Sequence, residues 1–131
     1  MERYLAAARA HGIPAAVAEL SDDVVMRNPA TDDVVVGREA VAGALNGVQA
    51  ECDEFVHTHL LEPGSTGDTR LYGLGFEARI GEARLQGADL VELDADDQIC
   101  SFTALARPVA SLMALGSRMA EHRSTADEPA A

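Results

Sequence analysis

The stretch LQGADLVELDADDQICSFTALARP, residues 85–108, predicts two long strands joined by a tight turn. In the first strand every second residue shares one face, and that face is apolar or small apart from Asp89; its other members are Leu85, Gly87, Val91 and Leu93. The opposite face carries Gln86, Glu92 and Asp94. This alternation is typical of a strand with one buried face, and the paired acidic residues at 96 and 97 suit the turn. We therefore expect an antiparallel hairpin that packs against a core.

Asp89 is the unusual residue of this hairpin because it shares the apolar register. A carboxyl group facing a core is either paired with a structural partner or forms part of a site, because an unpaired buried charge is costly. A bulge that shifted the register by one residue would instead turn Asp89 toward solvent. Asp89 is the first candidate for a functional residue.

Outward from the hairpin, the chain changes from helical to alternating patterns. Helices are predicted at 2–12, 13–23 and 37–48, and again at 108–122. Strands are predicted at 54–62 and 69–80, with a turn at 63–68 and a short β-branched run before Pro29. Helices followed by strands predict an α+β fold, in which three N-terminal helices pack on a strongly curved antiparallel sheet that encloses a pocket.

Length and charge limit the classes of function. At 131 residues, with 47% hydrophobic residues, we expect a single domain at 1–122 and a disordered polar tail at 123–131. The net charge of −12 argues against nucleic acid and anionic membranes as partners. No stretch is predicted to span a membrane or to act as a secretion signal, so we expect a cytoplasmic protein. Cys52 and Cys100 lack the spacing of a zinc site and are expected to be reduced.

The sequence resembles a known family, the SnoaL-like and ketosteroid-isomerase-like branch of the nuclear transport factor 2 superfamily. The resemblance covers nearly the whole chain and is carried by three stretches: RYLAAARAHGIPAAVAELSDDVVMRNP (3–29), VGREAVAGAL (36–45) and GADLVELDADDQICSFTALARP (87–108). It implies a cone-shaped pocket protein that forms homodimers, and the high Ala and Arg usage of the chain is typical of bacterial coding. In ketosteroid isomerases an Asp base moves a proton while a Tyr and a neutral Asp hold the enolate oxygen.

The resemblance assigns three candidate catalytic residues. It aligns Tyr4 with the tyrosine that binds the oxyanion and Asp89 with the protonated aspartate. Asn28, before Pro29, aligns with the family's base, and an amide does not accept a proton at neutral pH. The chain therefore keeps the donors that polarise a carbonyl and lacks the expected base.

Other residues are candidates for the base or for binding substrate. His57 and His59 alternate with apolar neighbours and are predicted to share a face, where they offer nitrogens for proton transfer or for a metal. The sequence shows no third ligand, so we expect no metal and no cofactor. Asp33 is a further candidate base. The remaining predicted pocket residues are apolar or aromatic and are Tyr72, Phe76, Val91 and Phe102.

Two functions remain open from the sequence. The first is an isomerase- or cyclase-type enzyme that acts on an apolar, carbonyl-bearing ligand, such as a polyketide- or steroid-like compound, through oxyanion stabilisation. The alternative is a non-catalytic ligand-binding or dimerisation module in which Asn28 orients the ligand. We also expect a homodimer, because Ile99, Thr103 and Leu105 are predicted on the outer face of the last strand.

Overall fold

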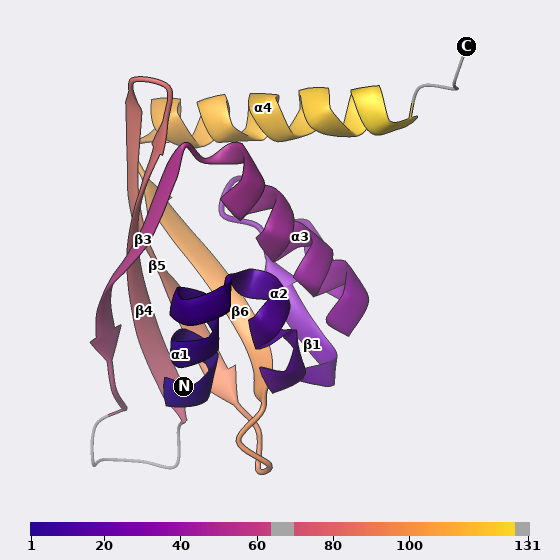
Figure 1. The fold of residues 1–131 in the computed structure, drawn as a ribbon, viewed down its shortest axis with the longest axis vertical. Helices are drawn as coiled ribbons and strands as arrows, with labels where there is room; N and C mark the ends of the chain where they lie inside the picture. The colour runs from indigo at the N-terminus through magenta and orange to yellow at the C-terminus, as the bar shows by residue number, and fades with distance from the viewer. Residues whose placement is uncertain (64–69, 128–131) are drawn as a thin grey trace.

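The computed structural model describes residues 1–63 and 70–127 as helices packed on one face of a single sheet (Figure 1). The helices are α1 (Glu2–His11), α2 (Ile13–Ala16), the 3-10 turn η1 (Val17–Glu19), α3 (Arg38–Glu51) and α4 (Val109–Asp127). The strands are β1 (Leu20–Arg27), β2 (Val34–Val36), β3 (Glu54–Leu61), β4 (Leu71–Ile80), β5 (Ala83–Leu93) and β6 (Ile99–Arg107). The predicted α+β class is confirmed.

The sheet is mixed, whereas the sequence predicts an antiparallel one. Its strand order is β2-β1-β6-β5-β4-β3, and the meander from β3 to β6 is antiparallel as predicted. β1 lies parallel to β6, and β2 pairs with β1 along the outer edge. The sheet is not strongly curled, so this part of the predicted fold is wrong.

β1 begins earlier than the sequence predicts. Residues 20–23 were expected to end the second helix, but the helical segment stops at Glu19. Leu20 and Val24 are both fully buried, because the strand beside β6 places them in the core. Tertiary packing here outweighs the helix propensity of the preceding alanines.

The helices are not all N-terminal. α4 follows the last strand, as the pattern at 108–122 predicts, and its far end reaches beyond α3 (Figure 1). The helix includes residues 123–127, which the sequence assigns to a disordered tail. No helix among the described residues is long and apolar enough to cross a membrane. Most of the predicted turn at 63–68 lies outside the described residues.

The inner faces of the strands form the core. Leu74 of β4, Val91 of β5 and Phe102 of β6 are at most 1% exposed, in agreement with the alternating pattern. Burying a large apolar side chain of this kind contributes roughly 1.5–3 kcal/mol. The core thus fixes which residues of β4, β5 and β6 point toward the helices.

Two bulges change the register of the strands. In β3 the pairing with β4 shifts between His57 and His59, so Thr58 is the extra residue. In β6 the pairing with β5 shifts beside Cys100. As a result Ile99 is 1% exposed and faces the core, and not the outer face predicted for it. A bulge adds one residue to a strand and reverses the facing of the residues beyond it.

Candidate functional site

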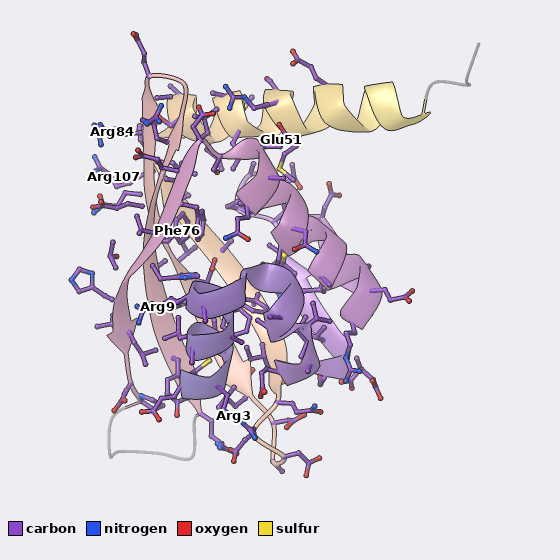
Figure 2. All side chains as sticks on the ribbon, viewed as in Figure 1. Arg3, Arg9, Glu51, Phe76, Arg84 and Arg107 are labelled. Atoms are coloured by element: carbon purple, nitrogen blue, oxygen red, sulfur yellow. The ribbon has the colours of Figure 1, made fainter. Side chains whose placement is uncertain are left out.

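A cavity of about 70 Å³ lies between the inner face of the sheet and the helices. Figure 2 shows Phe76 on the side of the sheet that faces α3. The cavity wall is apolar for the most part, with polar groups from Tyr4, Gln49, His57 and Asp89. Its apolar lining residues are Met26, Pro29, Leu45, Val48, Phe55, Phe76, Leu85, Ala104, Ala106, Leu112 and Leu115.

Asp89 lies in the middle of β5 and faces this cavity, in the register that the alternation predicts. Its neighbours across the sheet are Leu74 of β4 and Ala104 of β6. None of the described residues forms a hydrogen bond or an ion pair with the carboxyl group. No hydrogen bond or positive charge from the described residues therefore offsets the loss of solvent around the carboxyl group, and this burial raises the pKa of Asp89 to about 7. Near neutral pH a large fraction of Asp89 is a neutral acid that can donate a hydrogen bond.

Tyr4 reaches the same cavity from α1. Its side chain is 3% exposed and its ring packs against Phe102, with the ring centroids 5.9 Å apart. Burial, followed by the negative charge of Asp89, raises the pKa of Tyr4 above its usual value. The phenol consequently remains a proton-bearing donor across the physiological pH range. Phe102 and Val91 pack in the core cluster around Tyr4 and do not line the cavity, so they position the tyrosine.

His57 adds a third ionisable group to the cavity. Its ring contacts Phe55 edge-on, with a centroid distance of 5.2 Å, and Phe55 stacks on Phe76 at 5.3 Å. Burial and then the positive charge of Arg9 lower the pKa of His57. A neutral imidazole has one nitrogen free to accept a proton. Three groups predicted for the site, Tyr4, Asp89 and His57, are thus brought together.

Gly87 provides the space for the aromatic wall. A Cβ at this position would lie 2.6 Å from Cζ of Phe76 and 2.2 Å from the backbone oxygen of Leu105. Phe76 lies opposite Gly87 in the pairing of β4 with β5, and its ring fills the place of the missing side chain. The glycine in the apolar register of the sequence is therefore a packing requirement of the cavity.

Asn28 and Asp33 lie outside the cavity lining, unlike their predicted positions at the pocket. Asn28 is exposed, and its Oδ1 accepts hydrogen bonds from the N–H groups of Ala30 (2.7 Å) and Thr31 (3.3 Å). The backbone N–H of Asn28 donates to the Asp33 carbonyl. The Asn-Pro pair thus forms a turn, and only Pro29 contributes to the cavity.

His59 and Tyr72 also differ from their predicted positions. The bulge at Thr58 places His59 opposite Gly75 on the outer face, where it is exposed. Tyr72 borders a separate surface depression near the N-terminus, together with Met1 and Arg70. The alternating pattern around His57 and His59 does not predict the bulge that lies between them.

The helices α3 and α4 form a part of the cavity wall that was not predicted from the sequence. Leu45, Val48 and Gln49 of α3 and Leu112 and Leu115 of α4 share helix faces at spacings of three and four residues. This period is visible in the sequence and predicts a buried face. It does not show which part of that face borders a cavity.

Comparison with solved structures identifies the architecture, although no protein-family model and no curated protein sequence matches the chain. A steroid delta-isomerase from Pseudomonas aeruginosa is 26% identical, with a TM-score of 0.83 over 95% of this chain and 89% of that one. An uncharacterised bacterial protein with a cystatin-like fold, from Silicibacter pomeroyi, is 25% identical, with a TM-score of 0.81 over 96% and 85% of the two chains. This chain has the nuclear transport factor 2-like fold.

A more distant protein of the nuclear transport factor 2-like fold has been solved with a ligand. A Mycobacterium tuberculosis protein, 15% identical with a TM-score of 0.59 over 82% and 94% of the two chains, is in complex with estradiol-17β-hemisuccinate. The cavity of the present chain, at about 70 Å³, is much smaller than the roughly 300–1,000 Å³ of most small-molecule sites. Its volume fits one ring or the end of a longer ligand. Among the described residues, no group of three or more His, Cys, Asp or Glu could hold a metal ion.

Proposed function

We propose that this chain is an isomerase- or cyclase-type enzyme that acts on an apolar carbonyl compound by stabilising an oxyanion. The observation that carries the proposal is Asp89, a carboxyl group without a hydrogen-bond partner among the described residues, facing an apolar cavity beside the Tyr4 phenol. Such a group is costly unless a ligand uses it.

The two donors suit a carbonyl oxygen that gains negative charge. Neutral Asp89 and Tyr4 each offer one O–H to the same atom, and neither donor is held by another described side chain. In a cavity that excludes water, fixed donors of this kind lower the barrier by several kcal/mol. The apolar wall of the cavity therefore contributes to the proposed mechanism by keeping water away from the two donors.

His57 takes the role of the base that Asn28 does not supply. His57 lies in the same cross-strand row as Phe76 and Gly87, and Asp89 is two residues farther along β5. From usual strand spacings, the Cα atoms of His57 and Asp89 are roughly 12 Å apart, which leaves space between the side chains for a small ligand.

The proton transfer needs no cofactor. The imidazole accepts a proton from the carbon beside the carbonyl, and the electron pair of that C–H bond forms a double bond as the carbonyl π pair moves to oxygen. The enolate then takes the proton back from the imidazolium at a more distant conjugated carbon, and the carbonyl re-forms. A double bond shifts, and the enzyme returns to its starting protonation state.

The test uses a cyclohexenone whose double bond is β,γ to the carbonyl, and follows formation of the conjugated isomer by absorbance. We expect turnover by the wild type, a loss of about 100-fold or more in His57→Ala, and a similar loss in Asp89→Ala. His59→Ala is the matched control, because it changes the outward histidine of the same strand. Equal losses in both histidine variants would remove His57 from the proposal.

Ligand binding distinguishes the non-catalytic alternative, a ligand-binding module, from the proposed enzyme. Asn28 favours this alternative. Its amide oxygen accepts hydrogen bonds within the turn, and an amide does not act as a base at the position where ketosteroid isomerases carry one. Phenol serves as the probe because its oxygen resembles that of an enolate. Binding of phenol that depends on Asp89, without turnover of any cyclohexenone, would support the binding module in place of the enzyme.

We also propose that the chain forms a homodimer through the outer face of the sheet. Along this face β5 carries Arg84 at one end and Glu92 at the other, with Ala88 midway between them and Leu90 alongside. Leu105 of β6, 52% exposed, lies beside Ala88. A two-fold axis near Ala88 would bring each Arg84 to the Glu92 end of the other copy. The apolar centre and opposite charged ends are thus self-complementary.

A further inference from the structure

Arg9 is a positive group close to His57, and none of the acidic residues that the structure describes pairs with it. It projects from α1 toward the strands at the β3 edge (Figure 2) and acts electrostatically on His57, which lines the cavity. It forms no ion pair or hydrogen bond with a described side chain. Most of the other described arginines form an ion pair or a hydrogen bond, as in the pairs Arg3–Glu19 and Arg38–Asp22.

From this arrangement we infer that Arg9 is a specificity-determining residue, which binds an anionic group on the substrate. The ligand of the proposed enzyme is then an apolar carbonyl compound that also carries a carboxylate. Its carbonyl oxygen lies between Asp89 and Tyr4, and its carboxylate emerges past His57 to meet the guanidinium. This inference rests on the proposed function, since it uses the same cavity.

The protein is acidic overall, so Arg9 can attract an anion only at short range. With 22 acidic residues and a net charge of −12, the molecule as a whole repels an anion. A preference for an anionic ligand therefore requires a positive group close to its binding position. Guanidinium groups pair with carboxylates through two parallel hydrogen bonds, which an ester cannot reproduce equally well. Because Arg9 is exposed, the effect is expected to be modest and sensitive to salt.

The test compares para-hydroxyphenylpropionate with its methyl ester, two probes that share a phenol and differ in the anionic group. Calorimetry at low ionic strength should show the wild type binding the carboxylate about fivefold more tightly than the ester, as an exposed ion pair of about 1 kcal/mol implies. Arg9→Gln should abolish this preference while keeping the affinity for the ester. Arg3→Gln is the matched control, because it removes one charge from an exposed arginine of the same helix that is paired with Glu19.

Each outcome decides a separate point. Equal wild-type affinity for both probes, with binding that depends on Asp89, would overturn the role of Arg9 and leave the proposed cavity intact. An equal loss of preference in the Arg9 and Arg3 variants would show that the preference reflects the net charge of the protein, and it would also overturn the role of Arg9. Binding of neither probe would overturn the inference together with the proposed function.

Discussion

The ionisation of Asp89 links the cavity to the stability of the fold. Its pKa rises from 3.8 to about 7 on folding, so the folded state binds this proton more tightly than the unfolded state. The resulting cost is absent below the unfolded pKa, grows as the pH rises toward 7, and is then constant. At 1.4 kcal/mol for each pH unit between the two values, the cost reaches about 4 kcal/mol near neutrality.

Asp89→Asn is therefore expected to be more stable than the wild type at pH 7, with an advantage that shrinks toward pH 4. The amide keeps a hydrogen-bond donor and removes the charge. Urea unfolding of both proteins across this pH range measures the difference. A variant less stable than the wild type at neutral pH would show that Asp89 is ionised and paired, and would remove it from the oxyanion site.

At the residue scale, the sequence was informative where strand alternation was regular. Asp89 faces the cavity because β4, β5 and β6 pair without a shift around it. His59 lies outside the cavity because one extra residue in β3 reverses its facing, and the sequence has no mark for that bulge. Asn28 could be read as a turn residue or a site residue, and local hydrogen bonds favour the turn.

At the scale of elements, pattern predicted the meander and both long helices but not how they assemble. The alternating runs gave β3 to β6, whereas the parallel contact of β1 with β6 depends on which edge of the sheet is free. The same limit applies to α4, whose apolar spacing predicts a helix without showing that Leu112 and Leu115 close the cavity. Contacts between distant segments have no local signature.

The contribution of α4 can be tested by enlarging the cavity from the helix side. Leu112→Ala removes a lining side chain that is only partly buried, so we expect a moderate loss of stability, about 2 kcal/mol. Naphthol, too large for the native volume, should bind the variant more tightly than the wild type, as measured by fluorescence. Met113→Ala on the exposed side of α4, where Met113 is 60% exposed, should change neither property. Unchanged naphthol binding in Leu112→Ala would show that α4 does not limit the cavity.

The activity of the whole protein depends on pH through two groups of the cavity, Asp89 and His57, whose shifted pKa values define a pH window. Asp89 must be protonated, which holds below about pH 7, and His57 must be neutral, which holds above its lowered pKa. We expect kcat/KM to be highest in weakly acidic solution and to fall on the alkaline side as Asp89 ionises. Asp89→Asn should remove the alkaline fall, since an amide does not ionise. An alkaline fall unchanged in that variant would assign it to another group.

The outer face of the sheet is left uncovered in one copy of the chain. Val34, Val36, Val56 and Leu61 join Leu105 among its exposed apolar residues, and opposite charges stand at its two ends. We expect light scattering at micromolar concentration to report a dimer. Leu105→Asp should shift it to a monomer, because in a two-fold interface the new charge is buried twice. Val109→Asp, at an exposed position on α4, should leave the dimer intact. A monomeric wild type would mean that the charged ends and the apolar centre do not form an interface between copies.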